Sequence, residues 1–225
     1  MKNIKDICVI IQARLGSQRV PNKMIRPIAG TSLINIALKN IKKCTSFPRE
    51  NFFLSAFEPE LKEAASDLGL NIYHRSEQSA NSEGTPMYEM YEWWDKLPFK
   101  YCVLVNACAP FLKPETIDGF VKHYASTTSD GLFGVIKVKN YFWNVNHELL
   151  TPLTESVMNT KTVSPIYEAA HCLYAGRMDQ IGQQIWMGDF RTPGSIELYE
   201  MQEDECFDID YEWQFNLAEK ILLKD

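Results

Sequence analysis

The sequence predicts an α/β fold, in which a mostly parallel, doubly wound sheet is covered by helices on both faces. Short apolar runs rich in β-branched residues alternate with segments of helical periodicity as far as Tyr124. The chain has 225 residues with 45% hydrophobic content, enough to bury the core of one domain. In such sheets, ligands bind beyond the carboxyl ends of the strands, so the loops that follow the strands are the candidate sites.

The alternation predicts each element in turn. Apolar runs predict strands at Ile7–Gln12, Asn51–Phe57, Leu70–Tyr73 and Tyr101–Asn106. Capping residues and prolines predict helices from Thr31 or Ser32 to about Lys43, from Pro59 to Leu68, from Pro86 to Lys96 after a Thr85 cap, and from Pro114 to about Tyr124. A last amphipathic helix is expected from Tyr211 to Leu223.

Residues 130–175 depart from this alternation and are predicted to form a β-rich excursion from a single domain that spans residues 1–225. Strands are expected at Gly131–Lys139, Tyr141–Val145 and Ala169–Ala175, with a turn at Asn146–His147. The polar stretch from Thr154 to Pro165 is left without assignment. Exposed aromatic patches usually mark interfaces. The excursion is rich in aromatic residues, and it therefore predicts a homodimer.

Composition narrows the function classes. A net charge of −6 disfavours a general nucleic-acid binder. No apolar run approaches the length of a membrane span, and the polar start of the chain does not resemble a secretory signal, so a cytoplasmic protein is expected. The six cysteines form no CxxC pair and no zinc-type spacing, which predicts reduced structural thiols.

The segment Gln12–Lys23 predicts a phosphate-binding loop. Gly16 and Ser17 follow a buried strand and can turn backbone N–H groups toward an anion. Charge-assisted hydrogen bonds would come from Arg14, Arg19 and Lys23. The loop matches neither the GxxxxGK nor the GxGxxG pattern. A solvated loop with ordinary surface cations is the alternative, and the coincidence of three cations with Gly-Ser at a strand end favours phosphate binding.

Asp208 and Asp210 precede the last predicted helix and form a candidate metal site. Residues two apart in an extended chain face the same way, so both carboxylates could meet one cation. Mg²⁺ prefers one or two carboxylates together with phosphate oxygens. In the alternative, Asp210 caps the helix and Asp208 is a surface acid. Capping and metal binding are compatible, so both remain open.

These two motifs resemble those of a known family. The pattern A-R-x-G-S-x-R-x-P-x-K at residues 13–23, followed by Gly30 and Leu33-Ile34, resembles the signature loop of the acylneuraminate and Kdo cytidylyltransferases. Asp208-Ile209-Asp210, with Phe215, Leu217, Ala218 and Glu219, resembles the metal-binding segment of the sialic-acid-type enzymes. The resemblance covers most of the chain. It implies a nucleotidyltransferase (Rossmann-like) sheet, with the 130–175 excursion as dimerisation arm and acceptor-binding wall.

The resemblance also implies the reaction. CMP would pass from CTP to the anomeric hydroxyl of an acidic 2-keto sugar, a sialic acid-like nonulosonate, with release of pyrophosphate, and the CMP-sugar would serve cell-surface polysaccharide biosynthesis. One alternative is a nucleotidyltransferase of the same fold with another nucleotide, or with a phosphonate or phosphate acceptor. Another is a noncatalytic nucleotide-binding module, against which the intact carboxylate pair argues.

The implied site residues fall into four groups. The catalytic group is Arg14, Lys23, Asp208 and Asp210, of which Asp208 and Asp210 bind Mg²⁺. The nucleotide-binding group is Ala13, Arg14, Leu15, Gly16, Ser17, Arg19, Asn22, Lys23, Arg75 and Gly84. The acceptor-binding group is Asn106, Lys137, Tyr167 and His171. Asn106 stands where the family has glutamine, His171 stands where it usually has asparagine, and the metal-binding acid of the Kdo enzymes is absent, which favours the sialic-type subgroup.

Overall fold

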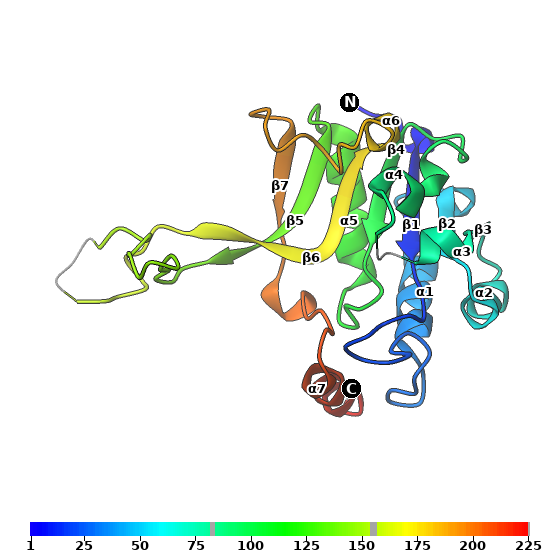
Figure 1. Cartoon of the computed structure of the whole chain (residues 1–225), viewed down its shortest axis with the longest axis horizontal. Coiled ribbons are helices and arrows are strands. Elements are labelled where there is room, and N and C mark those ends of the chain that lie inside the picture. Colours follow the sequence, from blue (N-terminus) through cyan, green and yellow to red (C-terminus); the bar gives the residue numbers. More distant parts are fainter. Residues whose placement is uncertain (82–83, 154–156, 225) are drawn as a thin grey trace.

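A computed structural model describes residues 1–81, 84–153 and 157–224. These residues form one seven-stranded sheet in the order β3-β2-β1-β4-β6-β5-β7 (Figure 1). Its strands are β1 (Ile7–Gln12), β2 (Phe52–Ala56), β3 (Ile72–His74), β4 (Tyr101–Val105), β5 (Gly131–Val138), β6 (Ile166–Arg177) and β7 (Ile196–Glu200). Of the strand pairs, β6 is antiparallel to both of its neighbours and all other pairs are parallel. The predicted α/β class and the mostly parallel sheet are confirmed.

The strand order reverses beside β1. The chain runs from β1 outward to β2 and β3, and then returns to place β4 on the other side of β1. Loops that leave the carboxyl ends of β1 and β4 therefore diverge and open a crevice between them. The loop after β1 is the predicted phosphate-binding segment, and Asn106 directly follows β4. The topology thus brings both to the same edge of the sheet.

Helices cover both faces of the sheet because β1 is apolar on both. Ile7, Val9 and Ile11 belong to one buried cluster, and Cys8 and Ile10 belong to another. The first cluster includes side chains of α1 (Leu33–Lys43), α2 (Pro59–Ser66), α5 (Pro114–Ser126) and α7 (Glu212–Leu222). The second includes side chains of the 3-10 helix η3 (Glu92–Trp94) and of α6 (Met178–Ile181). Two-sided burial is typical of central parallel strands.

Helix starts follow the predicted signals in three cases and depart from them in one. Ser32 caps α1 by accepting a hydrogen bond from Asn35 N at 3.4 Å, and proline stands at the start of α2 and α5. The predicted helix from Pro86 to Lys96 is wrong. It is divided into α4 (Met87–Met90) and η3, because Tyr91 leaves the helical region with φ −105° and ψ 36°. The Thr85 hydroxyl donates back to the Asn81 carbonyl instead of capping.

Two further predictions of secondary structure are corrected. Tyr141–Val145 is not a strand, since only an isolated bridge joins Trp143 to Leu149, around the predicted turn. The segment Cys206–Asp210, which was expected to be extended at the carboxylate pair, forms no strand and leaves the 3-10 helix η4 (Glu203–Glu205) as irregular chain. The remaining short helices are η1 (Ile4–Asp6), η2 (Arg49–Asn51) and α3 (Glu77–Ala80).

β5 and β6 continue past the sheet as a two-stranded ribbon that projects from the body of the molecule (Figure 1). The cross-strand pairs Lys137–Tyr167 and Val138–Ile166 lie on this ribbon. Part of the unassigned stretch, residues 154–156, lies outside the described residues. Across residues 1–81, 84–153 and 157–224, no helix has the length and apolar character needed to cross a bilayer.

Candidate active site

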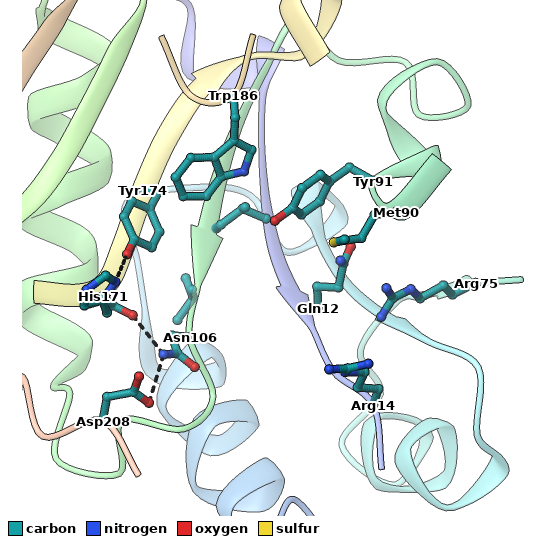
Figure 2. A pocket seen from close by; sticks show the side chains of 12 residues that line it. Gln12, Arg14, Arg75, Met90, Tyr91, Asn106, His171, Tyr174, Trp186 and Asp208 are labelled. Atoms are coloured by element: carbon teal, nitrogen blue, oxygen red, sulfur yellow. Dashed lines mark hydrogen bonds between the residues drawn. The ribbon is translucent and has the colours of Figure 1, made fainter. Parts of the chain in front are cut away.

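Two adjoining pockets open at the carboxyl ends of β1 and β4, and Gln12, Arg14 and Asn106 line both. We call the first, of about 380 Å³, the aromatic pocket; it is also lined by Arg75, Met90, Tyr91, Leu104, Val105, His171, Tyr174, Trp186 and Asp208 (Figure 2). We call the second, of about 420 Å³, the cationic pocket; it is also lined by Ala13, Ser17, Gln18, Arg19, Lys23, Met24, Ala107, Cys108 and Asp210.

The loop after β1 forms one wall of the cationic pocket, and local contacts determine its course. The backbone N–H of Leu15 donates to Glu58 Oε1 at 2.8 Å, which ties the start of the loop to the start of α2. Val20 is buried and anchors the middle. Asn22 adopts φ 53° in the left-handed region, which asparagine tolerates, and its carbonyl accepts from Ile25 N and Arg26 N. The chain therefore turns back toward α1 with its cations facing the pocket.

Asp210 forms ion pairs with two of these cations. Arg19 Nη2 lies 2.7 Å from Asp210 Oδ1, and Lys23 Nζ lies 3.6 Å from the same oxygen. The Lys23 ammonium also donates to the Ile209 carbonyl, and the Lys23 side chain is only 12% exposed. The loop after β1 and the acidic segment are thus joined by ion pairs across the cationic pocket.

Asp210 does not cap α7. The side-chain Oε1 of Gln214 accepts the backbone N–H of Asp210 at 2.7 Å and that of Tyr211 at 2.8 Å. The first turn of the helix is therefore closed by Gln214. This leaves the Asp210 carboxylate directed at the loop cations rather than at the helix.

Asp208 faces the aromatic pocket and has a different environment. Its Oδ1 accepts a hydrogen bond from Asn106 Nδ2 at 3.2 Å, and no Lys or Arg forms an ion pair with it among the described residues. Burial and the neighbouring charge of Asp210 raise its pKa, against smaller opposing effects of Lys23 and Asn106. A bound cation would stabilise the ionised carboxylate and so offset both effects.

The protein groups near Asp208 and Asp210 suit an Mg²⁺ site that is completed by substrate oxygens, and they do not suit a metal site made wholly of protein ligands. No cluster of three or more His, Cys, Asp and Glu side chains that could hold a metal occurs among the described residues. The chain thus supplies at most the two carboxylates here, and other oxygens would have to complete the octahedron. Mg²⁺ sites that use one or two carboxylates and substrate phosphates have this composition.

Asn106 joins three segments through one side-chain amide (Figure 2). Its Nδ2 donates to the His171 carbonyl at 2.8 Å as well as to Asp208, and its Oδ1 accepts from Cys108 N at 2.9 Å. His171 lies in the left-handed region with φ 55° and places ring Nδ1 2.6 Å from the Tyr174 hydroxyl. Such backbone strain in a non-glycine residue is concentrated at functional sites.

Arg75 is buried on the opposite side of the aromatic pocket, with 4% of its surface exposed. Its Nε donates to Ser79 Oγ at 2.8 Å, Nη2 donates to the Ser79 carbonyl, and Nη1 reaches the Ala13 carbonyl at 3.5 Å. Burial, followed by repulsion from Arg14, lowers its pKa to about 10. Arg75 therefore supports the loop that carries Ala13 while it borders the pocket.

The structure brings most, but not all, of the sequence-predicted residues together. Ala13, Arg14, Ser17, Arg19 and Lys23 line the cationic pocket, and Arg75, Asn106 and His171 line the aromatic pocket, as Asp208 does. Leu15, Gly16 and Asn22 belong to the same loop without lining either pocket. Gly84 also lines neither, and its neighbours Ser82 and Glu83 lie outside the described residues.

Lys137 and Tyr167 are not brought to either pocket. They face each other as a cross-strand pair on the projecting ribbon, and Lys137 Nζ lies 3.5 Å from Glu200 Oε2. Tyr167 is 47% exposed. A contact between these two residues and an acceptor held in the aromatic pocket is therefore not formed within the described chain.

Several lining residues were missed by sequence reasoning. Gln12 stood in the predicted loop segment but was given no role of its own. It is the polar end of an apolar strand, which the sequence shows, and it accepts a hydrogen bond from Trp93 Nε1 at 2.7 Å. Tyr91, Tyr174 and Trp186 form the aromatic part of the wall, and the Tyr174 and Trp186 ring centroids are 4.8 Å apart. Trp186 follows α6 in irregular chain, where no periodicity or motif indicates its position.

The sequence of this chain is similar to a family model and to curated proteins. A family model described as cytidylyltransferase matches residues 8–221. The spore coat polysaccharide biosynthesis protein SpsF of Bacillus subtilis is 24% identical over 135 residues, covering 56% of this chain and 53% of that protein. N-acylneuraminate cytidylyltransferase A of Danio rerio is 22% identical over an alignment of 229 positions, covering 98% of this chain and 51% of that protein. The chain spans about half the length of the curated relatives it matches.

Solved structures share the fold. A CMP:2-keto-3-deoxy-manno-octonic acid synthetase complexed with CTP superposes with a TM-score of 0.66 at 12% identity, over 97% of this chain and 98% of that chain. The 4-diphosphocytidyl-2C-methyl-D-erythritol synthase of Anaerococcus prevotii has a TM-score of 0.67 at 12% identity, over 98% and 99% of the two chains. At these identities the likeness shows the fold alone.

Proposed function

The chain belongs to the cytidylyltransferase family, and on this premise we propose that it transfers CMP from CTP to the anomeric hydroxyl of an acidic 2-keto sugar, with release of pyrophosphate. One observation carries the proposal. The cations Arg14, Arg19 and Lys23 and the carboxylates Asp208 and Asp210 converge on adjoining pockets at the strand-order reversal. Cations near carboxylates are what a triphosphate with a divalent cation requires.

The cationic pocket binds the β- and γ-phosphates. Arg14, Arg19 and Lys23 approach it from different points of one loop, and Ser17 adds a hydroxyl. Charge-assisted hydrogen bonds from several directions fix the β- and γ-phosphates, which leave together as pyrophosphate when the bond from the α-phosphorus to the bridging oxygen breaks. These side chains therefore position the nucleotide and neutralise the charge that develops on the leaving group.

The aromatic pocket receives the base and the acceptor at its two sides. Arg75, Met90 and Tyr91 border one side, and His171 and Tyr174 border the other, with Asp208 below them (Figure 2). We assign the cytosine to the Arg75 side and the acidic sugar to the His171 side. The acceptor hydroxyl then attacks the α-phosphorus between the two, where Arg14 lines both pockets.

Asp208 and Asp210 are the residues that would hold Mg²⁺. When bound, the ion would neutralise the α-phosphate and lower the pKa of the attacking hydroxyl. Asn106 orients Asp208 through its Nδ2 donor, and Arg14 holds phosphate charge from the opposite side. As part of this proposal, the enzyme prefers CTP among the nucleotides and takes a nonulosonate as acceptor. It is located in the cytoplasm and forms a homodimer. The SpsF and N-acylneuraminate cytidylyltransferase names support the acidic sugar and a role in cell-surface polysaccharide synthesis.

A substrate panel tests the proposal directly. Pyrophosphate release is measured with CTP, UTP, ATP and GTP, each against N-acetylneuraminate, other nonulosonates, Kdo, and phosphate and phosphonate acceptors. We expect release with CTP and a nonulosonate. Release confined to another nucleotide, or to a phosphate or phosphonate acceptor, would overturn the assigned substrates.

The carboxylates are tested separately. Asp208→Asn and Asp210→Asn keep the side-chain size and should fold normally, but lose about 10²–10³ in magnesium-dependent turnover, because one well-placed electrostatic contact contributes this much in other enzymes. Glu212→Gln is the matched control, since Glu212 is a nearby carboxylate that pairs with Arg26 outside both pockets. Parental turnover of both Asp variants at low magnesium would rule out the metal assignment.

A further inference from the structure

We propose that Asp210 has a second role, as an internal anion that occupies the phosphate-binding cations until nucleotide and metal displace it. This inference rests on the proposed function and adds a competition within the site. Asp210 Oδ1 is shared by Arg19 at 2.7 Å and Lys23 at 3.6 Å. A nucleotide phosphate must therefore compete with a carboxylate of the protein for both cations.

The arrangement is specific to this carboxylate. Of the three cations that line the cationic pocket, Arg14 forms no ion pair among the described residues and instead donates to the Ala80 carbonyl at 3.4 Å. Asp208 lies two residues from Asp210 but lines the other pocket and accepts from Asn106. Competition with phosphate is thus expected at Asp210 and not at Asp208.

The surrounding contacts hold Asp210 in place for this role. Its backbone N–H is bound by Gln214, and the preceding Ile209 donates its N–H to the Cys108 carbonyl at 3.0 Å. Lys23 is largely buried and also binds the Ile209 carbonyl, so its ammonium cannot leave the segment without losing two partners. Arg19 is 55% exposed and is the cation that can exchange partners most readily.

The consequence is a coupling between nucleotide and metal. A divalent cation at Asp210 removes the competing anion from Arg19 and Lys23, and a phosphate on these cations releases Asp210 for the metal. Each ligand then raises the affinity for the other by the same factor, because binding linkage is reciprocal. The ligand-free chain would bind each of them weakly when the other is absent.

The test measures metal-free binding of CTP and of inorganic tripolyphosphate in EDTA by calorimetry. Asp210→Asn should bind both probes about 3- to 10-fold more tightly than the parent, as expected when one partly buried and one exposed ion pair no longer compete. Asp208→Asn and Glu212→Gln remove the same formal charge nearby and should give a clearly smaller gain. In an Arg19→Gln background, the gain from Asp210→Asn should fall to half or less.

A second variant makes the test independent of Asp210→Asn. Ligand-free Arg19→Gln should bind Mn²⁺ at least threefold more tightly than the parent, because a cation that competes for Asp210 has been removed, whereas Arg26→Gln should not. An unchanged or weaker affinity of Asp210→Asn for both probes, or an equal gain in Glu212→Gln, would overturn the inference. A gain seen with tripolyphosphate but no CTP binding by any variant would support the competition while counting against CTP as the nucleotide.

Discussion

Replacing Asn106 by alanine tests whether this residue supports the site or contacts the acceptor directly. The substitution removes Nδ2 donors to the His171 carbonyl at 2.8 Å and to Asp208 at 3.2 Å, and the acceptor for Cys108 N at 2.9 Å. A hydrogen bond contributes about 0.5–1.5 kcal/mol net, and one to a charged group somewhat more. Because Asn106 is half-exposed, we expect a loss of about 2 kcal/mol in the free energy of unfolding.

The effect on turnover follows from the contact with Asp208. Removal of a residue that orients a metal ligand typically costs 10- to 100-fold in metal affinity or activity. Asn106→Ala should therefore lower kcat by about 10- to 100-fold and raise the magnesium concentration at half-maximal rate. The KM for the acceptor should change little, because the amide is already engaged by protein groups on both its nitrogen and its oxygen.

The assay combines urea unfolding with pyrophosphate release as a function of magnesium and of acceptor. Asn40→Ala is the matched control, since Asn40 Nδ2 donates to the Leu112 carbonyl at 2.8 Å without lining either pocket. It should cost about 1 kcal/mol of stability and leave turnover unchanged. A raised acceptor KM with parental kcat and magnesium dependence in Asn106→Ala would refute the supporting role and indicate a direct contact.

Three further predictions follow from the same structure. Arg14→Ala should weaken CTP binding or turnover severely with the melting temperature preserved, since Arg14 lines both pockets; equal affinity and turnover would contradict its role. Light scattering should show a homodimer, and Trp143→Asp on the 130–175 excursion should shift it toward monomer; a monomeric parent at all practical concentrations would refute this. Hydrogen bonds from Thr127 and His123 lower the pKa of Glu197. The stabilising effect of ionised Glu197 is therefore present above its ordinary pKa of about 4.3 and is lost as pH falls through the lower pKa of the folded state. Glu197→Gln should lower the free energy of unfolding by less than about 1 kcal/mol at neutral pH, and this difference should shrink in unfolding curves measured in acid. A difference that is constant with pH would contradict the assignment.

Much of the fold could be predicted because its signals are local. The strands β1 and β4 are continuous apolar runs, and the helices α1, α2 and α5 begin at a serine cap or a proline. β7 was missed because Ile196–Glu200 is short and its two glutamates interrupt the apolar run. The segment Pro86–Lys96 has helical composition, but Trp93 is fully buried in the second core cluster and the chain bends at Tyr91.

The candidate site also has features that local sequence predicts and features that it does not. The loop cations and the two carboxylates were predicted because their residue types and spacing follow strand and helix ends. The roles of the carboxylates could not be separated in this way. Their spacing of two residues did not indicate that Asp208 lines the aromatic pocket while Asp210 lines the adjoining cationic pocket, and whether both meet one cation stays a prediction.

The sequence by itself determined which chemical groups this protein places at the strand ends: a cluster of cations after the first strand, a carboxylate pair before the last helix, and a sheet that brings strand ends to one edge. These are properties of neighbouring residues, so they can be identified without the fold. Only the tertiary structure decided which of these side chains contact one another. Arg19 and Asp210 are 191 positions apart, and Asn106 joins His171 and Asp208 across 65 and 102 positions. Contacts over such separations depend on strand order and on the path of each loop, which no local pattern specifies.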